Sequence, residues 1–136
     1  MSGVFDLFHH GHIRIIEKAK NYKNLNNTIV IGIHNDEDVA KYKRKPIQTM
    51  SEREEIVKAC RYVDEVILNA PNVTTKEFLK SINCDMIAGI TCNCGNIMHD
   101  SQYDDVKDIF IDFGYTPGVS TTDLIERCYQ YRLKSL

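Results

Sequence analysis

The order of apolar segments in this chain predicts an α/β fold built on a doubly wound parallel sheet, with helices on both faces. Short apolar runs alternate with segments of helical periodicity, the pattern of strands joined by crossover helices. The run over 28–33 is continuously apolar and mostly β-branched, as expected of a strand buried on both faces. With 136 residues, 43% of them hydrophobic, the chain suits one domain, residues 1–136, with one core.

The first strand ends at Val4 and Phe5 and is very short or truncated, since so little sequence precedes the turn that follows it. Apolar residues at helical spacing predict a helix that begins near residues 10–12, and a turn follows at 24–27. Further strands are expected over 63–68 and 85–90. Further helices are expected over 36–42, over 51–61 with Ser51 as its cap, from Thr74 or Thr75 to 81, over 100–110, and from Ser120 or Thr121 onward.

Composition excludes several classes of protein. The net charge of −2 does not suggest a nucleic-acid partner. No run of eighteen apolar residues and no basic-then-apolar leader is visible, so neither a membrane segment nor a secretory signal is expected. Five cysteines, an odd number, indicate reduced thiols and a cytoplasmic location. Cys92 and Cys94 fit either inert thiols in a polar loop or, with unusually close spacing, a metal site.

The stretch GVFDLFHHGH places His9, His10 and His12 around Gly11, between a strand end and a helix start. A helix start offers free backbone N–H groups and a positive dipole end, which suit a phosphate. Gly11 would let that phosphate approach closely. His9 and His12, three residues apart, share one face over the helix mouth, where imidazoles can stabilise charge on a phosphoryl group. A surface metal site and incidental surface positions stay open as alternatives.

Together with further motifs in matching order, this stretch resembles the cytidylyltransferases of phospholipid head-group synthesis, which belong to the H-x-G-H nucleotidyltransferase superfamily. The further motifs are Lys41-Tyr42-Lys43, Ser51-Glu52-Arg53, the stretch from Arg61 to Val66, Asn69-Ala70-Pro71, Thr74-Thr75 and the stretch from Gly118 to Asp123. The resemblance covers nearly the whole chain. It implies a Rossmann-like sheet and an enzyme that transfers CMP from CTP to a phosphorylated alcohol and releases pyrophosphate.

The resemblance also assigns roles to residues of this chain. His9, His12, Lys41 and Lys43 would be catalytic, contacting the phosphates and stabilising the transition state; a solvated basic loop is the alternative for the two lysines. Mg²⁺ would arrive with CTP, without direct protein ligands. The second substrate would contact Asp6, Lys41 and Tyr62. The nucleotide would be bound by Val4, Phe5, His9, Gly11, His12, Gly89, Thr116, Ser120 and Thr121.

Among the substrates of the family, we favour phosphoethanolamine over phosphocholine, with glycerol 3-phosphate as the alternative, and we expect a homodimer. The chain departs from the family pattern at Tyr115, where the family has an arginine, and after Gly89, where the family often has an aspartate. A guanidinium near a triphosphate would supply a bidentate contact. A degenerate nucleotide-binding homologue with little turnover, and a donor other than CTP, are therefore rival interpretations.

Overall fold

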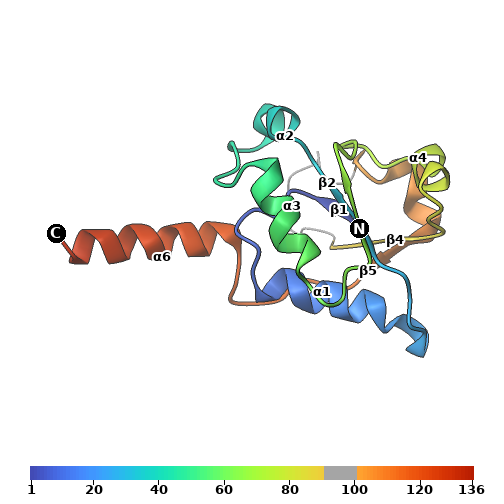
Figure 1. Cartoon of the computed structure of the whole chain (residues 1–136), viewed down its shortest axis with the longest axis horizontal. Coiled ribbons are helices and arrows are strands. Elements are labelled where there is room, and N and C mark those ends of the chain that lie inside the picture. The colour runs from blue at the N-terminus through green and yellow to red at the C-terminus, as the bar shows by residue number, and fades with distance from the viewer. Residues whose placement is uncertain (91–100) are drawn as a thin grey trace.

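The computed structural model describes residues 1–90 and 101–136, and within them it has the α/β class that the sequence predicts (Figure 1). The strands are β1 (Ser2–Gly3), β2 (Val30–Ile33), β3 (Glu65–Leu68), β4 (Ile87–Gly89) and β5 (Phe110–Asp112). The helices are α1 (His10–Lys20), α2 (Asp36–Tyr42), α3 (Met50–Lys58), α4 (Lys76–Ser81) and α6 (Thr121–Lys134), with short 3₁₀ turns η1 (Tyr22–Asn24) and η2 (Asp104–Ile109).

All the described strand pairs are parallel, and they form two sheets rather than one. The first sheet has the order β1-β2-β3, and the second pairs β4 with β5. The first strand is indeed very short, with two residues, and pairs with the carboxyl end of β2 through Ser2 and Gly3. The amino-terminal ammonium of Met1 extends this pairing by donating to the Val30 carbonyl over 2.8 Å.

Helices cover both faces of the first sheet, as a doubly wound arrangement requires. Ile31 and Ile33 of β2 are fully buried on the face that carries Ile16 of α1 and Val57 of α3. The alternate residue, Gly32, faces the other way, toward Ala70 and the α4 side. Successive side chains of a strand point to opposite faces, so the continuous apolar run of β2 is explained by burial on both of them.

Two local expectations are wrong. The helix expected over 100–110 is, where the structure describes it, the 3₁₀ turn η2 followed by strand β5. The cap of α3 is Thr49 rather than Ser51, because Thr49 and Glu52 form a reciprocal capping box two residues earlier. Of the alternatives left open, Thr75 caps α4 and Ser120 caps α6. The paired cysteines Cys92 and Cys94 lie outside the described residues.

Helix α6 projects from the body of the molecule and ends at the C-terminus, far from the sheets (Figure 1). None of its fourteen residues is buried, and Tyr129, Tyr131 and Leu133 are exposed along it. Its amino end, in contrast, returns to the carboxyl edge of β1, where the Thr121 hydroxyl donates to the Asp6 carbonyl over 2.9 Å. None of the described helices is long and apolar enough to cross a membrane.

Candidate active site at the carboxyl edge of the first sheet

The turn between β1 and α1 is strained. Phe5 and Leu7 adopt left-handed backbone conformations, with φ of 56° and 46°, which residues with a Cβ rarely adopt. Such strain persists only where surrounding contacts hold it, and it concentrates at functional sites. Here it aims the carboxylate of Asp6 inward and leaves the start of α1 open at the sheet edge, where ligands bind in open α/β sheets.

His9 and His12 cap helix α1 reciprocally. The Gly11 amide donates to His9 Nδ1 over 3.1 Å, and the His9 amide donates to His12 Nδ1 over 3.2 Å. The two rings stack with their centroids 3.9 Å apart, and the ring of His12 also stacks on Phe8. Because Nδ1 accepts a hydrogen bond in both rings, a neutral imidazole must carry its proton on Nε2. Both histidines are therefore hydrogen-bond donors through Nε2.

Both imidazoles are neutral near pH 7. Burial first, and the neighbouring His9 second, lower the pKa of His12 to about 3. The pKa of His9 is also lowered, by burial and then by His10. Burial disfavours the charged form because it removes water from the cation. The pair thus offers neutral N–H donors rather than fixed positive charges to an incoming anion.

Gly11 has a packing role that the sequence does not reveal. A Cβ at this position would lie 2.9 Å from the His9 ring and 2.9 Å from a methyl group of Val119. Its amide already donates to His9, so this N–H of the helix start is occupied rather than free. The absence of a side chain lets the His9 ring and the loop before α6 close over the helix mouth.

Asp6 is buried and serves as an acceptor for the basic segment, residues 41–46, and for the two residues that follow it. Its carboxylate receives the Ile47 amide at 2.9 Å, the Gln48 amide at 3.0 Å and the Arg44 guanidinium at 3.0 Å. Burial by itself would raise the pKa of Asp6, but these hydrogen bonds hold the pKa below its usual value. The carboxylate is ionised and already engaged, so it is not a spare ligand for a metal.

Arg53, expected from the sequence to anchor the basic loop or the nucleotide or else to pair with Glu54 or Glu55 on the surface, connects the ends of β1 and β2. Its side chain is fully buried. It donates to the Val4 carbonyl at 2.6 Å, to the His34 carbonyl at 2.9 Å and to Asp36 at 2.6 Å. The one sequence signal for this role is that Arg53 occupies the inward face of α3, four residues before the fully buried Val57.

The two lysines of the basic segment diverge. The Lys41 ammonium bonds to Asp38 at 2.7 Å, and its side chain is 73% exposed. Lys43 ends α2 in an extended conformation and lines the cavity beside His12 and Asp6. There, burial and then Arg44 lower the pKa of Lys43. The structure brings Lys43 to the site and leaves Lys41 outside it.

Two adjoining cavities lie at this edge and share His12 and Thr121 in their walls. The first has a volume of about 430 Å³ and is lined by Val4, Phe5, Asp6, His12, Val39, Lys43, Arg44, Pro46, Thr121 and Thr122. The second, of about 200 Å³, is lined by His9, Gly11, His12, Ile15, Ile90, Tyr115, Thr116, Val119, Ser120 and Thr121. Eight of the residues that the resemblance assigns to the nucleotide thus line one or both cavities.

Besides Lys41, two assigned residues lie elsewhere. Tyr62 packs against the main core, and its hydroxyl donates to Glu17 at 2.6 Å and accepts from Arg61 at 2.6 Å. Gly89 ends β4, where an added Cβ would meet the Phe110 ring at 3.0 Å, and its carbonyl accepts the Phe113 amide. Neither lines the two cavities.

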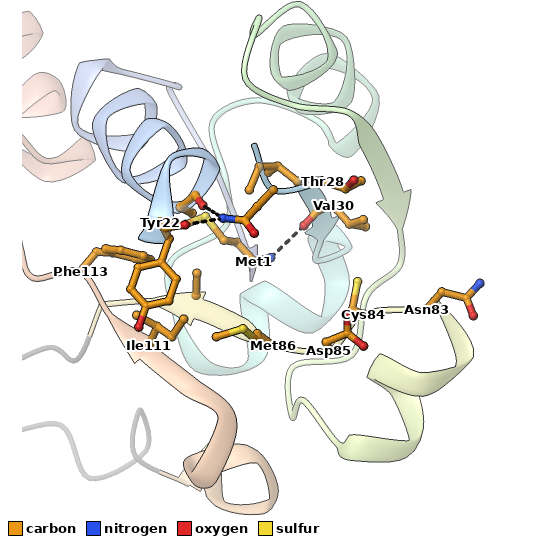
Figure 2. A pocket seen from close by; sticks show the side chains of 14 residues that line it. Met1, Tyr22, Thr28, Val30, Asn83, Cys84, Asp85, Met86, Ile111 and Phe113 are labelled. Carbon is orange, nitrogen blue, oxygen red and sulfur yellow. Dashed lines mark hydrogen bonds between the residues drawn. The ribbon is translucent and has the colours of Figure 1, made fainter. Parts of the chain in front are cut away.

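A third cavity, of about 370 Å³, lies at the opposite edge of the sheets (Figure 2). It is formed around Met1, Val30, Met86 and Phe113, near the amino ends of β2 and β4. Figure 2 shows the Met1 ammonium donating to the Val30 carbonyl at its wall. Burial lowers the pKa of this ammonium to about 6. Its position at the amino edge separates it from the histidine site.

Comparison with known proteins places this geometry in a family. The family model described as cytidylyltransferase-like matches residues 1–127. The chain belongs to the cytidylyltransferase-like family. The family resemblance read from the H-x-G-H stretch is thereby confirmed, and the two cavities lie around the residues that carry it.

Curated relatives of this cytidylyltransferase-like chain are named for two substrates. Choline-phosphate cytidylyltransferase 2 of Arabidopsis thaliana is 42% identical over 98% of this chain and 46% of its own length. Ethanolamine-phosphate cytidylyltransferase of Dictyostelium discoideum is 38% identical over 93% of this chain and 35% of its own length. The chain thus spans less than half the length of these relatives.

A solved structure supports the fold. The lipopolysaccharide core biosynthesis protein from Thermoplasma volcanium GSS1 superimposes with a TM-score of 0.61 over 88% of this chain and 94% of that one, at 18% sequence identity. At such low identity the likeness concerns the fold alone, and it agrees with the parallel α/β arrangement of Figure 1.

Proposed function

We propose that this protein transfers CMP from CTP to a phosphorylated amino alcohol and releases pyrophosphate. The observation that carries the proposal is the pair of neutral, Nε2-protonated imidazoles of His9 and His12 at the wall of two cavities, with Lys43 beside them. Donors fixed before the substrate binds stabilise charge that develops on a phosphoryl group at little reorganisation cost. The names of the relatives support the same reaction.

In this reaction an oxygen of the acceptor phosphate forms a bond to the α-phosphorus of CTP. The bond from that phosphorus to the bridging oxygen breaks, and pyrophosphate leaves with the electron pair. The chain holds the two reactants in line and donates hydrogen bonds from His9 and His12, while the Lys43 ammonium compensates phosphate charge. Val4, Phe5, Gly11, Thr116, Ser120 and Thr121 line the space for the nucleotide.

Mg²⁺ enters this proposal as a partner of the CTP phosphates. The carboxylate of Asp6 is already engaged by three donors, and no group of three potential ligands gathers among residues 1–90 and 101–136. In this proposal the nucleotide phosphates supply the oxygen ligands of the ion. Asp6 acts by holding the basic segment in place rather than by binding metal.

Phosphoethanolamine is the favoured acceptor, followed by phosphocholine. A quaternary ammonium calls for several aromatic faces, whereas a primary ammonium needs hydrogen-bond acceptors. Phe5 is the one Phe, Tyr or Trp side chain among the described residues that line the larger cavity, where the hydroxyl oxygens of Thr121 and Thr122 can accept hydrogen bonds. We propose in addition that the protein acts in the cytoplasm and that it forms a homodimer. Sedimentation of the purified chain would test the oligomeric state.

The deciding experiment measures pyrophosphate release from CTP and magnesium with phosphoethanolamine, phosphocholine or glycerol 3-phosphate. Release with phosphoethanolamine is the expected result. Release with glycerol 3-phosphate alone would replace the amino alcohol by a different acceptor. If no pyrophosphate is released with any of the three acceptors, while CTP still binds in calorimetry, the protein would be a nucleotide-binding homologue with little turnover.

A further inference from the structure

His34 belongs to none of the motifs that define the site, yet it is buried at the same carboxyl edge of the first sheet. It follows the last residue of β2, with 4% of its surface exposed. Its backbone is held on both sides, since its amide donates to the Gly3 carbonyl at 3.0 Å and its carbonyl accepts from Arg53 at 2.9 Å. The ring is thus anchored at the point where β1 and β2 end.

Both ring nitrogens of His34 have partners. Nε2 lies 2.8 Å from the Ser2 hydroxyl on β1, and Nδ1 lies 2.9 Å from the Tyr42 hydroxyl on the last turn of α2. Burial, followed by the charges of Lys43 and Arg53, lowers the pKa of His34 to about 4. The neutral ring donates through one nitrogen and accepts through the other, so both contacts are satisfied in either tautomer.

Tyr42 connects this buried ring to the cavity. The ammonium of Lys43 lies over the Tyr42 ring, 5.8 Å from its centroid, within the range of a cation–π contact. Lys43 in turn lines the larger cavity with His12. A continuous series of contacts therefore runs from Ser2 through His34 and the Tyr42 ring to the ammonium of Lys43.

We propose that His34 is a positioning residue: through its Nδ1 contact it fixes the Tyr42 ring on which the Lys43 ammonium rests, and so places that ammonium in the phosphate-binding cavity. Lys43 is followed by the loop of the basic segment, and a lysine side chain has many rotamers to lose. The contact with the Tyr42 ring reduces the rotamer freedom of Lys43 before the anion binds. The kinetic part of this inference rests on the proposed function.

Two substitutions of His34 separate its two contacts. His34→Asn places an amide near the position of Nδ1 and keeps a partner for Tyr42, whereas His34→Gln places its amide near Nε2 and keeps a partner for Ser2. We expect His34→Gln to lower kcat/KM for CTP about fivefold, the usual effect of one hydrogen bond, and His34→Asn to retain most activity. Tyr42→Phe should reproduce His34→Gln, and Ser2→Ala should match wild type.

A double-mutant cycle distinguishes positioning from general structural support. In a Lys43→Ala background no ammonium lies over the Tyr42 ring, so adding His34→Gln should change kcat/KM no further. An equal fivefold loss in both backgrounds would overturn the inference. So would equal kinetics of the Asn and Gln variants.

Amide hydrogen exchange tests the same contact without turnover. The Lys43 amide donates to the Val39 carbonyl at 2.9 Å, so it reports the last turn of α2. Each variant is measured at the same temperature interval below its own thermal midpoint. Under this condition, His34→Gln should speed amide exchange at Tyr42 and Lys43, and His34→Asn should not. If wild type proves inactive with every acceptor, the proposed function fails, and this comparison alone decides the inference: unchanged exchange in His34→Gln overturns it.

Discussion

At the scale of single residues, His9 and His12 determine each other's protonation. Each uses Nδ1 as an acceptor for a backbone amide of the same helix start, so the geometry that caps α1 also leaves the proton of each neutral ring on Nε2. Burial first, and the charge of a neighbouring imidazole second, lower the pKa values of both rings and keep them neutral. A capping box built from histidines thus leaves two N–H hydrogen-bond donors, which the proposed function assigns to the phosphates and which a capping box of Ser and Glu would not provide.

His12→Asn tests the donor role while sparing the cap. The asparagine amide oxygen can accept the His9 amide in place of Nδ1, but no group replaces Nε2–H. We expect turnover to fall about 10²- to 10³-fold, with the thermal midpoint little changed. Initial-rate kinetics and thermal unfolding measure the two effects. Substitution of the exposed neighbour, His10→Ala, is the matched control, and an equal loss in both variants would contradict the assignment.

Tyr115 is the second residue-scale test. It lines the smaller cavity with 60% of its surface exposed, and its hydroxyl donates to the Val119 carbonyl at 3.0 Å. We expect Tyr115→Arg to raise kcat/KM for CTP about tenfold, because a guanidinium there would add a charge-assisted contact to the triphosphate. Tyr129→Arg, on the exposed part of α6, adds the same charge elsewhere. A comparable gain in that control would attribute the effect to net charge.

At the scale of elements, α3 holds the carboxyl ends of β1 and β2 together through Arg53. Arg53 satisfies the carbonyls of Val4 and His34 together, and these carbonyls end two neighbouring strands. Asp36 balances its charge and also accepts the Met50 amide at the start of α3. The strained turn after β1 is therefore held in place by a helix that comes about fifty residues later in the chain.

Arg53→Leu should lower the free energy of unfolding by about 3 kcal/mol or more, because two buried carbonyls and the Asp36 carboxylate would lose their partner. Urea denaturation followed by circular dichroism measures the change. Lys58→Leu, on the same helix, removes an exposed ion pair with Glu54 and should cost less than about 1 kcal/mol. An equal decrease in the free energy of unfolding in the two variants would contradict the proposed role of Arg53.

The basic segment shows how a change of backbone separates two similar residues. Lys41 lies within α2, whereas Lys43 follows the helix in an extended conformation. Their ammonium groups consequently take different directions, one to Asp38 in solvent and the other into the cavity over Tyr42. Spacing along the sequence predicts a shared phosphate site only if both residues share one regular structure.

At the scale of the whole molecule, stability should fall in mild acid. His12 and His34 have pKa values lowered to about 3 and about 4, whereas an unfolded histidine titrates near 6.5. Below pH 6.5 the unfolded state therefore binds more protons than the folded state, and the free energy of unfolding decreases as the pH falls. The loss continues down to the folded pKa values.

We expect each of these two histidines to remove about 2 kcal/mol of stability between pH 6 and pH 4.5. Urea denaturation across this range measures the slope. The double variant His12→Asn/His34→Asn should show a flatter profile, because neither ring remains to be protonated. A double variant whose profile stays parallel to wild type would assign the acid sensitivity to other groups, such as the carboxylates that titrate at lower pH.

The short first strand shapes the molecule as a whole. β1 offers only two residues for pairing, and both pair with β2. The described strands divide into a three-stranded and a two-stranded sheet, and the third cavity lies between the amino ends of β2 and β4 (Figure 2). At the carboxyl edge, hydrogen bonds from Arg53 to Val4 and from Thr121 to Asp6 connect the end of β1 to α3 and α6 around the candidate site.

The sequence by itself determined the features that depend on local pattern. The apolar run before His34 indicated a doubly buried strand, the spacing around His9 and His12 indicated a helix mouth, and the combined motifs indicated the family. These follow because side-chain periodicity and capping preferences act within a few residues. The same local reasoning failed at β5, where a short strand is defined by its pairing with β4 and carries little periodic signal of its own.

Only the tertiary structure decided which polar residues reach the site. Asp6 is occupied by the segment that follows Arg44, Tyr62 is held by Glu17, and Lys43 rather than Lys41 lies in the cavity. The buried roles of Arg53 and His34 likewise depend on partners about 20 to 50 residues away. Burial and hydrogen bonding across such separations are set by how the elements pack, and the order of residues along the chain does not encode them locally.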